Sequence, residues 1–409
     1  MKIVTLTPQQ FDNYAKNHVN RNYFQTSKYG NIMIKFGYNV NYLGIVNEAN
    51  NIIGATLILS KIVFMKNKIA YAPRGILFDF TNKDATIQLV NELNQVLGKN
   101  NFMLLKMDPN DIQTIRDKKG NIINLNNSIN QIQANLTSIG FKFNGKNKYL
   151  ESEKPRWECI TLLNKDVKTM LNELPKRTRH KIRKAIISGV EILEGKEYLD
   201  KLYLLFKEKN KLPLTYYKEL SKEFNSSVYI SKLDTEKFVI SSRKLYENEM
   251  HRNDKLSQKI QNMQLKETTR QKILNTKMES DKLLAIYKKY VVFSTQLLKK
   301  HPSGLILGGS ITIDYDNATY IIAEGHDKNY SFINGNYLMR WEIIKKAKNN
   351  NFKYVNMGAI AGEFTNKNPY KGLNEMKLGY NGKAIEYIGE YEIILNKIAY
   401  MLYQKLKKK

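Results

Sequence analysis

A long segment without glycine or proline constrains the fold of this chain more than any other feature of its sequence. The segment covers residues 235–300 and is rich in Lys, Glu, Gln, Asn and Met. Apolar residues recur within it at helical spacing: Leu256, Ile260, Met263, Ile286, Tyr290 and Phe293. The pattern predicts two long helices that form an antiparallel hairpin with a turn near residues 266–270. Because the apolar seam is narrow, we expect this arm to contact something outside its parent domain.

The segments on either side of the arm alternate between strand-like and helical patterns, which is typical of an α/β fold. In residues 1–150, strand signals such as Phe102–Met107 surround a helical pattern at about residues 84–97, and Thr7-Pro8 predicts an earlier capped helix. A comparable order returns in residues 151–234 and 304–389. We therefore predict a first α/β domain at 1–150, a second at 151–234 and 304–389, and an inserted arm at 235–303. A C-terminal helix within residues 390–409 should pack on the first domain.

The charge balance favours a polyanionic partner. The chain has 66 Lys and Arg against 38 Asp and Glu, a surplus of 28, and such a surplus attracts nucleic acid or a phosphate-rich membrane surface. A genome that favours Lys and Asn codons is the alternative explanation. The most basic stretch is PKRTRHKIRK at residues 175–184. On a helix its cations occupy two neighbouring faces: Arg177, Lys181 and Lys184 on one, and Arg179 and Arg183 on the other. This surface is either a phosphate clamp or a solvated helix face.

The sequence favours a reducing compartment. Cys159 is the only cysteine, so a disulfide within the chain is excluded. The N-terminal residues MKIVTLTPQQF lack the apolar run of a signal peptide, and no stretch approaches the roughly 18 apolar residues of a membrane span. We expect a soluble, cytoplasmic protein. Its basic tail, YQKLKKK at residues 403–409, is either solvated or rests on anionic lipid.

Several catalytic chemistries lack their sequence signatures. The five histidines are scattered and there is one cysteine, so we expect no metal site. The chain has no P-loop lysine motif, no GxGxxG and no GxSxG. ATP hydrolysis, redox chemistry and metal-dependent hydrolysis are therefore disfavoured, and we expect no cofactor. A transferase with an already activated substrate, or a binding module, remains.

A series of motifs in fixed order is more specific. The C-terminal third carries YIIAEG at residues 320–325, YVNMG at 354–358 and GLNEMKLGY at 372–380. The N-terminal half carries YAPRG at residues 71–75 and LLKMDP at 104–109. Together these motifs resemble the Fem family of peptidoglycan-bridge transferases over nearly the whole chain. The resemblance includes the helical arm, which only part of that family carries.

The resemblance implies two acetyltransferase-like (GNAT-type) domains with a substrate groove between them. It implies transfer of Gly, Ala or Ser from aminoacyl-tRNA to the amine of a peptidoglycan stem or growing bridge. The acceptor would be lipid II or its soluble nucleotide precursor, UDP-MurNAc-pentapeptide. A peripheral contact with the inner face of the membrane and a homodimer or paralogue partner stay open. The arm and the basic face of residues 175–184 are candidate tRNA contacts, with a structural or dimerising arm as the alternative.

Two catalytic residues follow from the resemblance. Lys377 matches a lysine at the family's reaction centre, where a fixed cation would stabilise the oxyanion formed when an amine attacks the tRNA ester. Asp108 matches an aspartate proposed as the base in some members. A backbone carbonyl or a substrate phosphate could take the proton instead. The structural alternatives are an ordinary surface lysine and a routine turn residue at the end of a strand.

The resemblance also implies substrate-binding residues. Tyr320 matches a strand tyrosine that meets the acceptor, with core packing as the alternative, and Tyr216 and Tyr217 match a pair of aromatic residues. Lys211 stands where some members have an arginine on the acceptor's diphosphate, so the charge is kept but the bidentate fork is lost.

Phosphate binding by the first domain departs from the family pattern. The family's phosphate-contacting lysine falls on Met33 of this chain, with Lys28 and Lys35 nearby. Phosphate binding by this domain is therefore either lost or remodelled, with Lys35 as the candidate contact.

Two other functions are compatible with the same fold. An acyl-CoA-dependent N-acyltransferase would need a glycine-rich pyrophosphate loop, and the nearest candidate, residues 329–336, has only Gly335. A non-catalytic tRNA- or RNA-binding protein would not need Lys377, whose presence therefore favours an enzyme.

Overall fold

The computed structural model describes residues 1–208, 212–261 and 266–407. The elements of the first third are β1 (Lys2–Thr5), α1 (Pro8–Ala15), α2 (Ser27–Lys35), β2 (Asn39–Val46), β3 (Ile52–Phe64), β4 (Asn67–Ala72), α3 (Lys83–Lys99), β5 (Phe102–Met107), β6 (Ile112–Arg116), β7 (Ile122–Leu125), α4 (Ile129–Ser138) and β8 (Lys142–Phe143).

The elements that follow are β9 (Trp157–Leu162), α5 (Val167–Glu173), α6 (Lys176–Ile187), β10 (Val190–Glu194), η1 (Lys196–Tyr198), α7 (Leu199–Phe206), α8 (Leu214–Glu223), β11 (Asn225–Leu233), α9 (Thr235–Gln261), α10 (Glu267–Lys300), β12 (Leu305–Tyr315), β13 (Ala318–His326), η2 (Lys328–Ile333), α11 (Gly335–Asn349), β14 (Tyr354–Ala359), α12 (Lys371–Leu378), β15 (Lys383–Tyr387), β16 (Tyr391–Ile394) and α13 (Lys397–Lys407). The predicted α/β fold class is confirmed.

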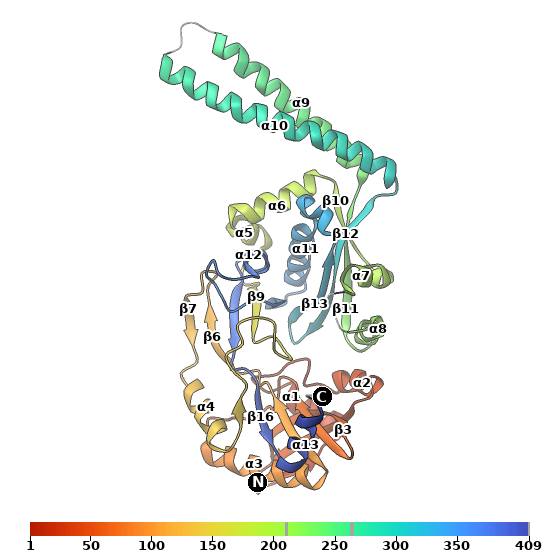
Figure 1. Cartoon of the computed structure of the whole chain (residues 1–409), viewed down its shortest axis with the longest axis vertical. Coiled ribbons are helices and arrows are strands. Elements are labelled where there is room, and N and C mark those ends of the chain that lie inside the picture. Colours follow the sequence, from red (N-terminus) through yellow and green to blue (C-terminus); the bar gives the residue numbers. More distant parts are fainter. Residues whose placement is uncertain (209–211, 262–265, 408–409) are drawn as a thin grey trace.

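The first sheet forms the end of the molecule opposite the arm (Figure 1). Within the described residues its strand order is β1-β2-β3-β4-β5-β16-β8. Only β4 and β5 are parallel in it, and they pair from Lys68 and Phe102 to Ala72 and Met107. Helices α3 and α4 supply apolar side chains to the core on one face. Helix α1 begins at a capping box between Thr7 and Gln10, as the sequence predicts.

The second sheet lies between the first sheet and the arm. Its order in the described chain is β10-β11-β12-β13-β14-β9-β15-β6-β7. The parallel strands β13 and β14 pair over only three positions, from Ala318 and Tyr354 to Tyr320 and Asn356. Both strands then continue without pairing to each other, so the sheet opens at their carboxyl ends.

Two segments cross the predicted domain boundaries. The β6–β7 hairpin lies within residues 1–150, yet β6 pairs with β15 in the second sheet. Strand β16 pairs with β5 and β8 in the first sheet. The two sheets are thus tied by exchanged strands, and α13 follows β16 onto the first sheet, where Ala399 packs against Met103 and Leu104.

Helices α9 and α10 form the arm, which projects away from both sheets (Figure 1). The predicted turn is placed too late, because α10 begins at Glu267 and residues 267–270 belong to that helix. Met263, part of the predicted seam, lies outside the described residues. A buried polar cluster joins the helices: Ser280 donates a hydrogen bond to Glu249 (2.6 Å), and Asn253 donates to Ser280 (3.1 Å).

No helix in the described ranges is both long and apolar enough to cross a bilayer.

Candidate functional site

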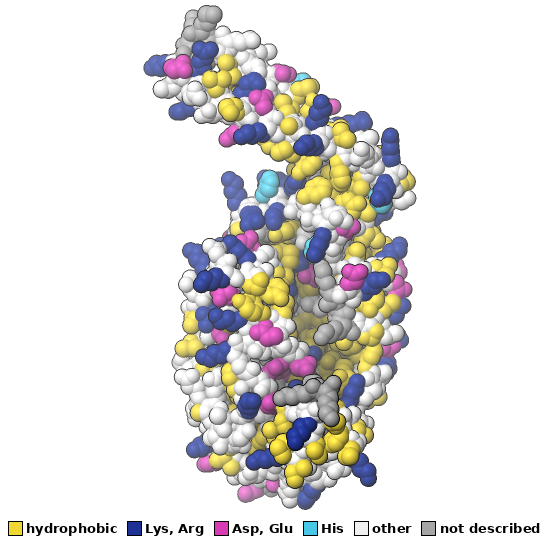
Figure 2. Space-filling model, in the orientation of Figure 1, with side chains coloured by type: hydrophobic (Ala, Val, Ile, Leu, Met, Phe, Trp, Pro, Cys, Tyr) yellow, Lys and Arg dark blue, Asp and Glu magenta, His cyan; other side chains and the backbone are white. Residues whose placement is uncertain are grey.

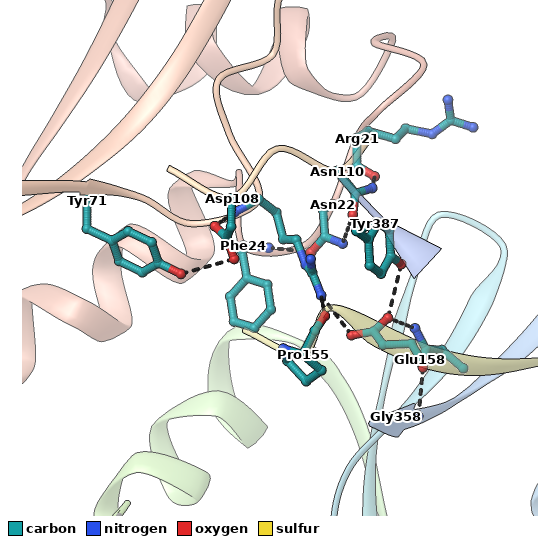
Figure 3. A network of polar contacts seen from close by, with 12 residues as sticks. Arg21, Asn22, Phe24, Tyr71, Asp108, Asn110, Pro155, Glu158, Gly358 and Tyr387 are labelled. Atoms are coloured by element: carbon teal, nitrogen blue, oxygen red, sulfur yellow. Dashed lines mark hydrogen bonds and ion pairs between the residues drawn. The ribbon is translucent and has the colours of Figure 1, made fainter. Parts of the chain in front are cut away.

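Asp108 lies where the two parallel strands of the first sheet end together. Strand β5 ends at Met107, opposite Ala72 of β4, so the residues that follow both strands meet at one edge of the sheet. The Asp108 carboxylate accepts hydrogen bonds from the backbone N–H of Arg74 (2.7 Å) and from the hydroxyl of Tyr71 (3.2 Å). Figure 3 shows Tyr71 and Asp108 facing each other. The YAPRG motif thus supplies the residues that hold this carboxylate.

Arg74 carries the contact across to the second sheet. Its side chain is only 2% exposed and donates to the carbonyl oxygen of Pro155 (2.6 Å). It also forms an ion pair with Glu158 on β9, with 3.1 Å between Nη2 and Oε1. The guanidinium lies over the ring of Tyr387 on β15. A buried ion pair needs this set of partners, because either charge alone would be poorly solvated.

From Glu158 the network continues to the opening between β13 and β14. The second carboxylate oxygen of Glu158 accepts hydrogen bonds from Asn356 (2.7 Å) and from the hydroxyl of Tyr387 (3.1 Å). Asn356 in turn accepts a hydrogen bond from the backbone N–H of Gly358 (2.7 Å). Figure 3 shows Glu158 between Tyr387 and Gly358. The polar chain therefore runs from the edge of the first sheet into the second.

Lys377 lies at the far end of this chain. It is buried on α12, and its ammonium donates a hydrogen bond to the carbonyl oxygen of Ala359 (2.8 Å). A side chain at Gly358 would approach the ammonium to 3.5 Å, so the lysine nitrogen lies beside Gly358. Burial lowers the pKa of Lys377, while the carboxylate of Glu324 opposes that effect. An ordinary surface lysine would be neither buried nor shifted in its pKa.

Electrostatics also set Asp108 apart. Burial raises the pKa of Asp108 to about 6, although the charge and backbone N–H of Arg74 and the charge of Lys154 act in the opposite direction. Burial lowers the pKa of Lys154 to about 8, and its ammonium lies 3.9 Å from the centre of the Phe24 ring. A carboxyl group with a pKa near 6 is a carboxylate at neutral pH and can still take up a proton. Asp108 and Lys377 stand at opposite ends of the network and share no hydrogen bond or ion pair among the described residues.

The predicted aromatic residues lie in a core that joins both halves of the protein. Tyr320 on β13 packs edge-on against Tyr23, and its hydroxyl lies 2.9 Å from that of Tyr354. Tyr216 and Tyr217 on α8 pack at right angles to each other. Burial raises the pKa of Tyr216 to about 12. All three rings are buried, which agrees with the packing alternative for Tyr320.

Two lysines, Lys35 and Lys211, are the predicted phosphate contacts. Lys35, at the end of α2, forms an ion pair with Glu219 on α8, and its nitrogen lies 4.0 Å from Glu223. In the structure Lys35 therefore joins two helices, and a phosphate would have to compete with Glu219. Lys211 lies outside the described residues.

The five predicted tRNA-binding cations lie on α6, near the base of the arm (Figure 1). Three of them contact other side chains. Arg177 pairs with Glu375, Lys181 donates to the hydroxyl of Tyr337, and Lys184 donates to the hydroxyl of Tyr290 on α10.

The other two cations differ in setting. Arg179 donates to the carbonyl oxygen of Asn172. Arg183 lines a cavity of about 290 Å³ between α6 and the arm, with Lys184 and Tyr290 also in its wall.

Further cavities among the described residues lie away from the polar network. Two of about 470 and 390 Å³ lie beside the β6–β7 hairpin and share Lys118 and Lys119 in their walls. Neither is lined by Asp108 or Lys377. Figure 2 shows that the molecular surface is hollowed over the second sheet, near the position of β13 in Figure 1. Within the described ranges, no three His, Cys or carboxylate side chains gather as metal ligands would.

A model of the FemAB family matches residues 6–408. The chain belongs to the FemAB family. Its relatives include a lipid II:glycine glycyltransferase of Staphylococcus epidermidis, 23% identical over 421 residues, with 100% of this chain and 96% of the relative covered. They also include the aminoacyltransferase FemA of Staphylococcus aureus, 25% identical over 443 residues, with 100% and 99% covered.

Among solved structures, FemX matches this FemAB-family chain with a TM-score of 0.69 and 21% identity. The match covers 98% of this chain and 99% of FemX. The likeness shows that the two proteins share a fold.

The sequence did not single out the residues that link the two ends of the network, among them Arg74 and Glu158, nor Lys154 beside Asp108. Arg74 stands inside the quoted YAPRG motif, so the motif itself was the available signal. Glu158 and Lys154 had none, because their roles depend on contacts between segments far apart in the chain.

Proposed function

We propose that this protein transfers an aminoacyl group from aminoacyl-tRNA to an amine of a peptidoglycan precursor. The acceptor is lipid II or its soluble precursor UDP-MurNAc-pentapeptide, and the reaction builds the interpeptide bridge. Support comes from full-length relatives named lipid II:glycine glycyltransferase and aminoacyltransferase FemA. We place the reaction in the cytoplasm, at the inner face of the membrane when the acceptor is lipid II.

The observation that carries the proposal is the buried polar chain from Asp108 to Gly358, which ends beside Lys377. The same polar chain thus connects a candidate base, Asp108 in the first domain, with a candidate hydrogen-bond donor to the oxyanion, Lys377 in the second. A substrate held between the two sheets would meet both groups.

The proposed reaction needs no cofactor. The acceptor ammonium passes its proton to Asp108 through a polar group of the substrate, because Asp108 and Lys377 lie at opposite ends of the network. The pKa of about 6 leaves Asp108 ionised at neutral pH. The neutral nitrogen attacks the ester carbonyl of the aminoacyl-tRNA, and a C–N bond forms. The oxyanion of the tetrahedral intermediate is stabilised by Lys377, which has three N–H donors and gives one of them to Ala359. The C–O bond to the tRNA ribose then breaks, and the ribose oxygen takes the proton that the attacking nitrogen releases as the amide forms. Since the ester is already activated, positioning contributes much of the acceleration.

The acyl-CoA alternative gains no support from the structure. Gly335 begins α11, and a side chain there would come within 2.9 Å of Leu307 and 3.0 Å of Ser231. Close packing against the sheet explains this glycine without a pyrophosphate.

The proposal is tested by transfer of radiolabelled glycine, alanine and serine from charged tRNA to lipid II and to UDP-MurNAc-pentapeptide. Label in either acceptor with one donor supports the proposal and identifies the donor. No transfer by folded protein with any donor and either acceptor would contradict it and favour a binding module.

The tRNA contact is tested separately on α6. Arg179→Glu/Arg183→Glu should weaken the affinity for charged tRNA. It should also reduce the slope of log affinity against log salt by about 1–2, because binding releases fewer counterions when phosphate contacts are lost. Lys83→Glu/Lys99→Glu on α3 makes the same charge change at exposed positions of the first domain and should leave both quantities unchanged. Equal loss in both variants would refute a specific contact at α6.

A further inference from the structure

The C-terminal helix α13 exposes the side chains that a helix on a soluble protein usually buries. It spans Lys397–Lys407 with the sequence KIAYMLYQKLK. Four large apolar side chains are strongly exposed: Ile398 at 70%, Met401 at 57%, Leu402 at 46% and Leu406 at 55%. A set of this size on one short helix is unusual for a solvated surface.

The exposed residues share one face of the helix. At 3.6 residues per turn, positions 398, 401, 402, 405 and 406 fall on one arc. The opposite side carries Ala399, Tyr400 and Tyr403, which pack on the first sheet around Met103 and Leu104. The helix is therefore already held to the protein by one apolar side, and a second apolar side faces outward.

The charges on α13 are all positive. Lys397 and Lys405 are exposed, and the helix contains no Asp or Glu. Lys405 lies in the middle of the outward arc, among Met401, Leu402 and Ile398. Figure 2 shows hydrophobic side chains gathered at this end of the molecule, with Lys and Arg side chains among them. The β3–β4 hairpin, at the same end, exposes Ile62 and Met65 as well.

We propose that the outward face of α13 docks the protein onto an anionic lipid surface. Apolar side chains would enter the boundary between headgroups and acyl chains, and the lysines would reach the lipid phosphates. A second copy of the chain fits this face less well, because pairing it with itself would bring Lys405 toward its own copy inside an apolar contact. The inference rests on the proposed function in one respect: an acceptor of lipid II type is fixed in a membrane, and docking would bring the enzyme to it.

The test is sedimentation of the full chain with vesicles. Wild type should bind vesicles made of equal amounts of phosphatidylglycerol and phosphatidylcholine, and binding to phosphatidylcholine alone should be at least about tenfold weaker. Ile398→Glu/Leu402→Glu should weaken binding to the anionic vesicles by at least about tenfold. The matched control is Ile240→Glu/Met278→Glu on the arm, where the replaced side chains are 65% and 58% exposed. It adds the same charge and should stay within about twofold of wild type, since the arm lies far from α13 (Figure 1).

Three results would overturn the inference. They are no vesicle binding by wild type, an equal loss of vesicle binding in both variants, or a wild-type protein that does not bind vesicles but forms a dimer that dissociates in the α13 variant. A second measurement separates this inference from the proposed function. Transfer to lipid II in detergent micelles should be the same for wild type and the α13 variant, whereas transfer to lipid II in vesicles should fall in the variant. If wild type transfers to neither form, the proposed function fails. If both proteins transfer equally to both forms, only the role of α13 fails.

Discussion

Replacing Asp108 with Asn would separate the cost of burying this carboxylate from its use as a base. The pKa of Asp108 is raised from 3.8 to about 6, chiefly by burial. A carboxyl group with a higher pKa in the folded than in the unfolded state binds protons more tightly when folded. The folded protein therefore loses stability as the pH rises from about 4 to about 6, and the loss is complete above that range. At 1.36 kcal/mol per pKa unit, the loss is about 3 kcal/mol.

Asparagine removes the charge and keeps the shape. Its carbonyl oxygen can still accept the hydrogen bond from the Arg74 backbone. Asp108→Asn should therefore have a free energy of unfolding up to about 3 kcal/mol above wild type at pH 7.5, with little difference at pH 4. Urea unfolding followed by circular dichroism at the two pH values measures this difference in free energy.

Transfer by Asp108→Asn should fall by about 10²–10⁴-fold, the usual contribution of a general base. In wild type, kcat/KM should decline about tenfold per pH unit below pH 6.

Asp111 provides the matched control. It is partly buried, burial raises its pKa to about 6, and its Oδ2 has no hydrogen-bond partner among the described residues. Asp111→Asn should gain stability at pH 7.5 in the same way while transfer stays near the wild-type rate. The reasoning is refuted if Asp108→Asn is less stable than wild type at pH 7.5, or if it transfers within about threefold of wild type.

Three further variants test other parts of the structure. Lys377→Met removes the buried ammonium with little change in shape. The melting temperature should stay the same or rise, while transfer should fall by about 10²–10³-fold. Transfer within tenfold of wild type would contradict the proposed role of Lys377. Arg74→Gln removes one of the two positive charges that lower the pKa of Asp108, and Lys154 keeps the other, so the acid limb of the pH–rate profile should move to higher pH. An unmoved limb would show that Arg74 and Asp108 are not coupled. Ser280→Val removes a hydrogen-bond donor from the buried Glu249 and should destabilise the arm by about 1–3 kcal/mol. Amide hydrogen exchange should then become faster in α9 and α10 alone. Faster exchange throughout the chain would argue against an independently unfolding arm.

Local features of the fold could be predicted from the sequence because they depend on neighbouring residues. The capping box at Thr7 and Gln10, the buried strand Phe102–Met107 and the left-handed Gly189 after α6 are each encoded within a few positions. The long helices of the arm follow from composition and periodicity in the same way. Its turn was misplaced because nothing in that polar stretch stops a helix.

The exchanged strands could not be predicted locally. The β7 side chains are exposed, and β6 finds its partner β15 some 270 positions further along the chain. Strand pairing at that separation depends on how the sheets assemble, so the sequence pattern around β6 and β7 does not predict it.

The candidate site was predictable only in part, for a related reason. Asp108 and Lys377 stand in motifs with a recognisable order, whereas the Arg74–Glu158 ion pair depends on how the two sheets meet. Lys35 illustrates the opposite case. Its charge suggested a phosphate contact, but Glu219, brought close by α8, already neutralises it.

Mass spectrometry of lipid II can show whether this chain joins an activated aminoacyl ester to a peptidoglycan amine. Lipid II would be incubated with wild-type protein and tRNA charged with glycine, alanine or serine, and the stem peptide analysed by mass spectrometry. The account predicts a stem peptide heavier by one or more aminoacyl residues, linked by a new amide at its amine, and no product when the same free amino acid replaces the charged tRNA. A stem peptide left unchanged by every charged tRNA, or one acylated instead from an acyl-CoA, would contradict it.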